Sequence, residues 1–205
     1  MAVAVHSQLL RIVGTDGEIV GDFDTLQGTL TTEQYLLFTN DSRRLIEFTN
    51  GKLEVLPMPT KRHQIILGFL YRALHAYMQL IGGIVLFAPL RLQIRDGQFR
   101  EPDLLLLIDT DDPRGQDAYW IGADMVVEIV SPDNPERDTV VKRADYAEAG
   151  IPEYWIVNPE DETVIVLQLT GNQYSEYGLF GRGDLARSVL LEGFSVSTND
   201  IFDAR

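Results

Sequence analysis

The chain has 205 residues and a mass of 23.1 kDa, a length typical of one domain. Hydrophobic residues make up 45% of it and charged residues 23%, an ordinary globular composition that argues against disorder. A net charge of -14 disfavours a generic nucleic-acid binder, because such proteins usually present a basic surface. The absence of cysteine excludes disulfides, zinc–thiolate sites and cysteine nucleophiles.

The charge is distributed unevenly along the chain. Residues 41–100 carry nine Lys and Arg against four Asp and Glu, a local charge of +5, and the remainder carries -19. The N-terminus lacks the basic region and long apolar stretch of a secretory signal. The nearly apolar residues 81–90 are too few to cross a bilayer, which takes ~20 residues. We therefore expect a cytoplasmic protein without a membrane partner.

The first elements are indicated by cap and turn residues. Residues 1–27 are rich in Gly and Asp and predict a loosely ordered segment ahead of a single domain over 28–205. Thr31 and Thr32, before EQYLLF, are typical of a helix start with a threonine as N-cap. In residues 45–56 two alternating runs flank Asn50-Gly51, which favours a type I′ hairpin turn.

Two helices are predicted in the middle of the chain. Residues 60–80 give the stronger signal, because Thr60 can cap the helix and apolar residues follow from Ile66 at spacings of four, three and four. A second helix is predicted over 138–149, where Gly150 would end it.

Apolar or alternating runs predict strands between and after these helices. They cover residues 83–88, 90–95, 102–108, 124–130, 153–157, 163–169, 174–180 and 185–191. A strand-rich chain with two central helices indicates a mixed α+β layered domain.

Two carboxylates stand in apolar strands, where burial is costly unless they are paired or bound to a metal. Asp103 opens PDLLLLI and Glu128 lies within VVEIV. If these strands pair antiparallel in the simplest register, residue i faces residue 231 minus i, and the two Cβ atoms lie ~4.5–5.5 Å apart. A hard cation such as Mg²⁺ would relieve the repulsion. The alternative is that Asp103 merely starts a strand and Glu128 is a solvated edge residue.

The helix that follows adds a cation. Asp138, Lys142 and Tyr146 are spaced i, i+4, i+8 and share one helical face. The ammonium of Lys142 could point toward Glu128, where it would orient a metal-bound water or neutralise a phosphate in the transition state. The alternative is an exposed Asp138–Lys142 pair worth only ~0.3–0.5 kcal/mol. For Tyr146, packing is favoured over a hydrogen bond to the site.

Further candidates lie near the first hairpin. With the turn at Asn50-Gly51, Glu47 faces Glu54, which suggests a cation, a shared proton or nearby Arg and Lys, or else an exposed pair on the polar face. Glu54 could complete a metal shell or hold a metal-bound water. His63, in the first turn of the long helix, could bind a phosphate, orient Glu54 or play a structural role.

Together, Pro102-Asp103 and Glu128-Ile129-Val130 resemble the PD-(D/E)xK nuclease superfamily, although the lysine that usually follows the Glu by two residues is here Val130. Over residues 28–203 the chain is similar to the Uma-type restriction endonuclease family, long catalogued as a domain of unknown function. In families of this arrangement the lysine stands on the following helix, which corresponds to Lys142. The resemblance rests on LIEFTNGKLEVLPMPTKRHQ, EPDLLLLI, DMVVEIVSPD, RDTVVKRADYAEAGIPEYWIV and LLEGFSVSTNDIF.

The resemblance implies a restriction-endonuclease-like core, with a central mixed sheet flanked by helices and additional hairpins. It implies a metal at Asp103, Glu128 and the backbone carbonyl of Ile129, and it places the acidic positions of the family on Glu47 and Glu54 and its histidine on His63. We therefore expect an endonuclease that depends on Mg²⁺ or Mn²⁺ and acts on DNA. The alternatives are an inactive binding module, or the same chemistry on RNA or another phosphodiester.

Two expectations concern partners. Cutting both strands of a duplex needs two active sites, so a homodimer is expected. The two protomers would meet through the C-terminal strands, whose exposed aromatic residues would be Tyr174, Tyr177 and Phe180. The basic segment is expected to line one side of a nucleic-acid groove with Arg43, Arg44, Lys52, Lys61, Arg62 and Arg72.

Overall fold

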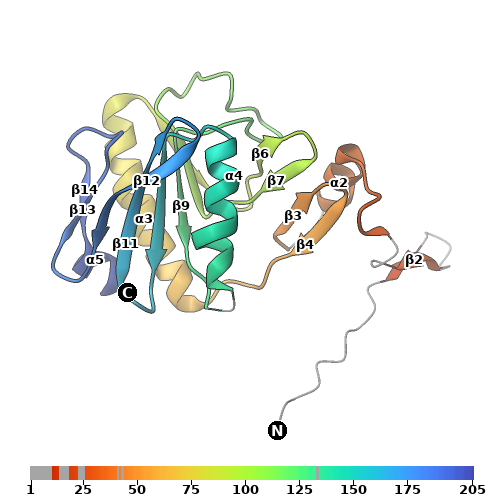
Figure 1. The fold of residues 1–205 in the computed structure, drawn as a ribbon, viewed down its shortest axis with the longest axis horizontal. Helices are drawn as coiled ribbons and strands as arrows, with labels where there is room; N and C mark the ends of the chain where they lie inside the picture. Colours follow the sequence, from red (N-terminus) through yellow and green to blue (C-terminus); the bar gives the residue numbers. More distant parts are fainter. Residues whose placement is uncertain (1–10, 14–18, 23–25, 41, 43, 133) are drawn as a thin grey trace, which may run out of the picture.

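A six-stranded mixed sheet forms the centre of the molecule (Figure 1). The computed structural model describes residues 11–13, 19–22, 26–40, 42, 44–132 and 134–205. The strand order is β12-β11-β10-β9-β8-β5, in which only the β9–β10 pair is parallel. The strands are β5 (Ile84–Phe87), β8 (Leu104–Leu107), β9 (Met125–Ile129), β10 (Glu153–Asn158), β11 (Thr163–Thr170) and β12 (Gln173–Phe180).

Both faces of the central strands are buried, which explains why β8 and β9 read as continuous apolar runs. Alternate residues enter two hydrophobic clusters. One lies under helices α3 (Lys61–Ile81) and α5 (Thr198–Phe202), and the other lies under helix α4 (Lys142–Glu148). The sheet is therefore covered by helices on both sides, which confirms the predicted fold class.

Helix α3 confirms the strongest helix prediction to within one residue. The Thr60 side chain caps it by accepting a hydrogen bond from the backbone N–H of His63. Residues Ile66, Leu70 and Leu74, spaced by four, are buried against the sheet. Gly82 ends the helix in the left-handed region at φ 80°. No helix among the described residues combines the length and apolar composition needed to cross a membrane.

A second, four-stranded sheet stands beside the first in the order β4-β3-β7-β6. Helix α2 (Thr32–Thr39), capped by Thr31 as predicted, packs on it through Tyr35, which stacks on Phe48 at 4.8 Å. Its strands are β3 (Ile46–Thr49), β4 (Lys52–Val55), β6 (Leu92–Arg95) and β7 (Gln98–Arg100).

The β3–β4 turn matches the prediction. Asn50 and Gly51 have φ of 48° and 81°, and β3 pairs with β4 so that Glu47 faces Glu54. Gly51 is required for a second reason, because a Cβ there would lie 2.6 Å from the backbone of Gly28.

The helix predicted over 138–149 has two parts. A π-helical turn, η1 (Arg137–Val141), precedes α4, and the N–H of Lys142 bonds to the carbonyl of Arg137, five residues earlier. The extra residue in this turn is a local irregularity of a kind that is frequent at functional sites. Gly150, at φ 72°, follows the end of the helix as expected.

The last predicted strand is shorter than expected. The strand expected over 185–191 ends after β13 (Leu185–Arg187), which pairs with β14 (Ser195–Ser197). The chain turns inward at this point because the N–H groups of Val189 and Leu190 donate to the buried carboxylate of Glu153, at 2.8 and 2.7 Å.

The N-terminal prediction falls largely on residues outside the described set. Within that set β1 (Arg11–Val13) pairs antiparallel with β2 (Ile19–Asp22). Loose order over 1–27 and a single domain over 28–205 stay predictions.

Candidate active site

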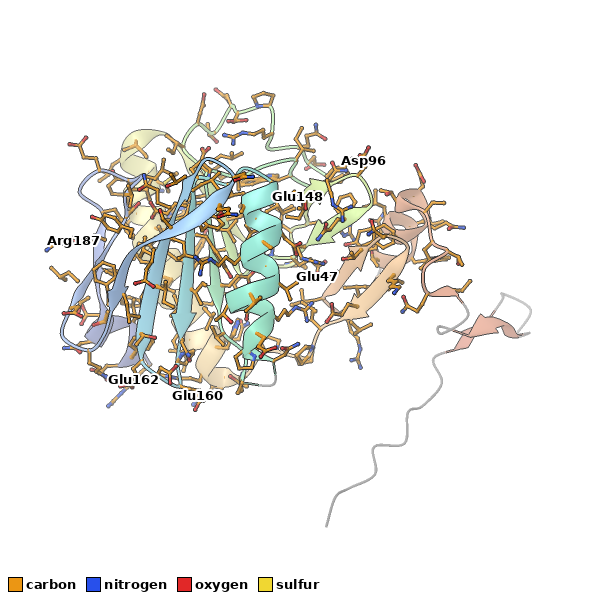
Figure 2. The ribbon with its side chains drawn as sticks, viewed as in Figure 1. Glu47, Asp96, Glu148, Glu160, Glu162 and Arg187 are labelled. Carbon is orange, nitrogen blue, oxygen red and sulfur yellow. The ribbon has the colours of Figure 1, made fainter. Side chains whose placement is uncertain are left out.

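A cleft of about 550 Å³ lies between the two sheets. Its walls come from the end of the β3–β4 hairpin, the first turns of α3, the loop after β5, the ends of β8 and β9, and η1. Figure 2 shows that Glu47 points into the region between the hairpin and helix α4, whereas Asp96, Glu148 and Glu160 lie at the periphery. Glu47 is therefore distinct from the solvated carboxylates of the surface.

The strands that carry Asp103 and Glu128 pair in the predicted register. Leu105 faces Val126, and all three observed pairs have residue numbers that add up to 231. The ladder ends one residue short of the Asp103–Glu128 pair, and both side chains line the cleft.

Asp103 is held in place by two donors. Its Oδ2 atom accepts a hydrogen bond of 2.7 Å from the N–H of Ile129 and one of 3.1 Å from Nε2 of His63. Burial alone would lower the pKa of His63, but the hydrogen bond and charge of Asp103 raise it. The hydrogen bond of His63 is thus to Asp103, whereas the alternatives that it orients Glu54 or binds a phosphate stay predictions.

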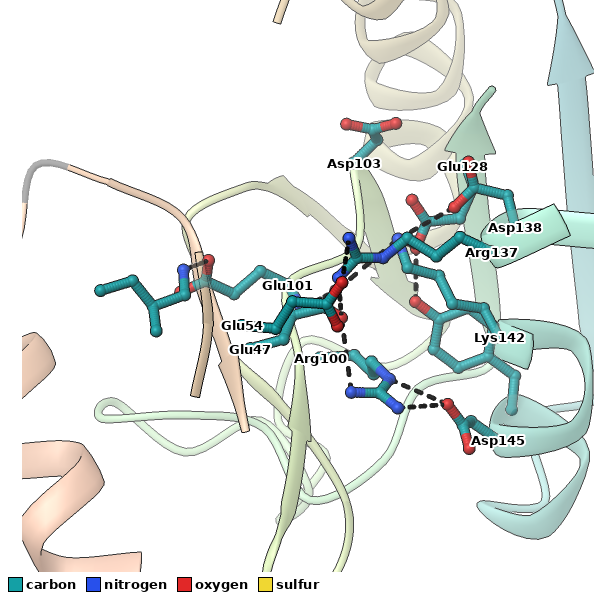
Figure 3. Close-up of polar contacts among 12 residues, drawn as sticks. Glu47, Glu54, Arg100, Glu101, Asp103, Glu128, Arg137, Asp138, Lys142 and Asp145 are labelled. Carbon is teal, nitrogen blue, oxygen red and sulfur yellow. Dashed lines mark hydrogen bonds and ion pairs between the residues drawn. The ribbon is translucent and has the colours of Figure 1, made fainter. Parts of the chain in front are cut away.

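Lys142 reaches the strand carboxylate from helix α4 (Figure 3). Its Nζ atom lies 2.8 Å from Oε1 of Glu128, 3.1 Å from Oδ1 of Asp138 and 3.7 Å from Oε1 of Glu47. Lys142 and Asp138 are each 4% exposed, so the alternative of an exposed surface pair is wrong.

Tyr146 also bonds to the same carboxylate, although packing was the favoured expectation. Its hydroxyl donates to Oε1 of Glu128, and its ring is completely buried against Tyr154. Tyr154 in turn donates to the backbone carbonyl of Asp138 at 2.8 Å. The Glu128 carboxylate is therefore fixed by a lysine and a tyrosine from one helical face.

The paired carboxylates of the first hairpin are bridged by an arginine, one of the alternatives expected from their register. Arg137 donates to Oε2 of Glu47 at 2.7 Å and contacts Oε1 of Glu54 at 3.0 Å. Glu47 is buried, whereas the side chain of Glu54 is 60% exposed at the cleft rim. The alternative of a pair with both carboxylates exposed is therefore wrong, because only Glu54 is exposed.

Four charged residues of this network were missed in the sequence. Arg100 pairs with Asp145 at 2.7 Å and with Glu47 at 3.4 Å, and Glu101 accepts from the N–H of Ile46 at 2.8 Å. For Arg100 and Glu101 the sequence did offer a signal, because the two residues directly precede the Pro-Asp motif. The missed residues are Arg100, Glu101, Arg137 and Asp145 (Figure 3).

The network is short of positive charge. Burial raises the pKa of Glu128 to about 8, although Lys142 opposes the shift. For Glu47 burial also favours the neutral form, but the cations Lys142, Arg100 and Arg137 outweigh it and lower the pKa. Burial would lower the pKa of Lys142, yet the surrounding carboxylates raise it. Lys142 is therefore a fixed cation at neutral pH.

The donors suit a hard divalent cation. Mg²⁺ is usually bound by one or two carboxylates together with water and substrate phosphate. Among the described residues, Asp103 makes its hydrogen bonds through Oδ2, and Glu128 makes its polar contacts through Oε1. The other carboxylate oxygens, Oδ1 of Asp103 and Oε2 of Glu128, could therefore bind a cation. No group of three His, Cys, Asp or Glu side chains in this part of the chain forms a metal site. The other ligands would come from the main chain, water or substrate.

Of the basic residues expected to line one side of a nucleic-acid groove, only Arg44 lines the cleft among those that the structure describes. Of the six residues, Arg43 lies outside the described set, and Arg44 lines the cleft. Arg62 lines a smaller pocket of about 110 Å³ and bonds to the carbonyl of Phe202. The other three, Lys52, Lys61 and Arg72, are exposed and do not line the cleft.

Comparison with known proteins identifies the family of the chain and a structure of the same fold. A crystal structure described as a "putative nuclease belonging to DUF820", from Anabaena variabilis, superposes with a TM-score of 0.71 at 20% identity, covering 85% of this chain and 98% of that one. No curated protein matches the sequence. Residues 32–199 match the Uma2 family, which is described as "Putative restriction endonuclease". The chain therefore belongs to the Uma2 family of restriction-endonuclease-like proteins.

Proposed function

We propose that the protein is an endonuclease that hydrolyses phosphodiester bonds in DNA with the help of Mg²⁺ or Mn²⁺. The observation that carries the proposal is the position of Lys142, which bonds Glu128 in the cleft that Asp103 also lines. A buried lysine beside two strand carboxylates at a cleft suits phosphoryl chemistry better than a structural ion pair. Family membership and the relative described as a nuclease support this proposal.

Asp103, Glu128 and the backbone carbonyl of Ile129 would hold the cation. A cation bound there would polarise the scissile phosphate and lower the pKa of the attacking water. His63 keeps Asp103 in its ligating orientation, and Tyr146 does the same for Glu128.

Lys142 is proposed to stabilise charge in the transition state rather than to act as a general base. Because its pKa is raised, it stays protonated and would stabilise the negative charge that develops on the phosphate. Asp138 and Glu47 hold the ammonium in place, and Arg137 links Glu47 to Glu54 at the rim. Glu54 thus supports the site as an exposed residue that could contact bound water.

Cleavage is expected to require a divalent cation. Supercoiled plasmid and a labelled oligonucleotide should be cut in Mg²⁺ or Mn²⁺ and left intact in EDTA, because the two carboxylates alone cannot activate water. An RNA of the same sequence, assayed in parallel, tests the alternative substrate. Cutting that proceeds equally in EDTA would refute the metal assignment.

A binding module without turnover is the second candidate. It is favoured by the salt bridge between Lys142 and Glu128, which already offsets part of the carboxylate charge, and by the acidic composition. Calorimetry with Mn²⁺ separates the two. No heat of binding at millimolar metal, with the fold intact by circular dichroism, would support the module.

The homodimer stays a prediction, and part of its basis is wrong. Tyr174 is buried and donates to the carbonyl of Ile151 at 2.7 Å, whereas Tyr177 is 49% exposed on the edge strand β12. Light scattering at micromolar protein is expected to give twice the monomer mass. A monomer mass at all concentrations tested would remove the prediction.

A further inference from the structure

The cleft is lined by two unlike groups of residues. Asp103, Glu128 and Lys142 form its charged end. An apolar wall comes from the segment between β4 and α3, from the last residue of β5 and from the loop that follows it. Its residues are Leu56, Pro57, Met58, Pro59, Phe87 and Pro89.

The apolar wall contains an aromatic ring with a large exposed surface. Phe87 is 46% exposed and Met58 is 69% exposed, so both present apolar surface at the cleft that a ligand could cover. The ring of Phe87 packs edge-on against Tyr71, with centroids 5.1 Å apart and planes at 85°. Tyr71 thus restrains the ring from one side.

This ring is anchored next to the charged end. Phe87 pairs with Leu104 in the sheet, and the N–H of Ala88 bonds to the backbone carbonyl of Asp103 at 3.3 Å. The backbone next to Phe87 is therefore hydrogen-bonded to Asp103, whose carboxylate is a candidate metal ligand. A nucleic-acid strand in the cleft could place a phosphate at the charged end and a neighbouring base against Phe87.

We propose that the wall around Phe87 and Met58 binds an unpaired nucleobase, so that the substrate enters the cleft as a single strand or as a locally unpaired segment. The inference rests on the proposed function, from which it takes the nucleic acid. In a duplex the flat faces of the bases are stacked on one another, and only groove edges and phosphates reach a protein. An aromatic wall can be used only by a base that has left the stack.

The size of the cleft favours the same substrate. A volume of about 550 Å³ falls within the ~300–1,000 Å³ of pockets that enclose one small molecule. Such a space suits a nucleotide or a dinucleotide rather than a turn of duplex. The prolines and aliphatic residues of the wall offer no side-chain hydrogen-bonding groups, so binding there should depend little on base identity.

The test measures stacking without cleavage. A single strand of about 12 nucleotides with a central 2-aminopurine is titrated in EDTA, and both anisotropy and 2-aminopurine fluorescence are followed. A blunt hairpin duplex of the same sequence is titrated in parallel. We expect quenching of 2-aminopurine in the single strand and an affinity at least about tenfold above that of the duplex.

Substitutions of Phe87 and Met58 test whether these side chains bind the base. Phe87→Ala should weaken single-strand binding about tenfold and abolish the quenching, whereas Phe87→Trp should retain both. Met58→Ala, at a more exposed position, should weaken binding without affecting folding. The matched control is Phe38→Ala, because Phe38 is 48% exposed on helix α2 and does not line the cleft.

The outcomes separate this inference from the proposed function. Equal binding of duplex and single strand, or unchanged quenching in both Phe87→Ala and Met58→Ala, would overturn the inference even if the protein cuts DNA. Quenching that depends on Phe87 would support it even if no cleavage is found in any metal. A single-strand substrate also needs only one active site.

Discussion

Metal-dependent cleavage is expected to fall by at least about 10²-fold when Glu128 is replaced by glutamine. The change keeps the volume of the side chain but removes the charge that would hold the cation and that bonds Lys142. Initial rates in Mg²⁺ measure the effect, and calorimetry with Mn²⁺ should show a parallel loss of affinity.

Glu153→Gln provides a matched control. Glu153 is 1% exposed and lies on β10, the strand parallel to β9, but it bonds Trp155 and the N–H groups of Val189 and Leu190 rather than lining the cleft. This variant should lose stability and keep its cleavage rate per folded molecule. Equal rates in wild type and Glu128→Gln would rule out Glu128 as a ligand.

Replacing Lys142 by methionine is expected to lower the free energy of unfolding by ~3–5 kcal/mol near neutral pH. The ammonium is the shared partner of Glu47, Glu128 and Asp138, all nearly buried, and its removal leaves them without that cation. Lys61→Met, at an exposed helix position, should change stability by less than ~0.5 kcal/mol.

The loss should depend on pH in a defined direction. The pKa of Glu128 is raised to about 8 by burial even with Lys142 present, and that of Asp138 is raised as well. A carboxyl whose folded pKa exceeds its unfolded pKa makes folding less favourable as pH rises from the unfolded value through the folded one. Without Lys142 this penalty grows, so the deficit should be largest above about pH 8 and shrink toward about pH 4.5. Urea unfolding at both ends of that range measures it, and an equal deficit at both would contradict the assignment.

The strand registers could be predicted because they depend on local rules. Asn50-Gly51 sets the turn, and alternation of side chains then places Glu47 opposite Glu54. The apolar runs around Asp103 and Glu128 similarly admit few alignments that keep both strands buried. Local rules and the family resemblance therefore sufficed for the backbone that presents the site.

Burial and long-range partners could not be predicted in the same way. The spacing of Asp138 and Lys142 is the same for an exposed pair and for a buried one, and the partners that Lys142 meets in other elements, Glu128 and Glu47, distinguish the two. Arg100 and Arg137 contact Glu47 from 53 and 90 positions along the chain, which no local pattern reveals. The π-helical turn, which begins at Arg137, was likewise not predicted from the helical spacing.

The ion network has a consequence for protein engineering. Glu47 belongs to the four-stranded sheet, and Lys142 belongs to the helix that covers the six-stranded sheet. The ion pair between them therefore links the two sheets through a residue that is also proposed for catalysis. Activity and stability are thus not separable at Lys142. An inactive but well-folded protein for binding studies is better made at Glu128, with Lys142, Asp138 and Glu47 left to hold each other.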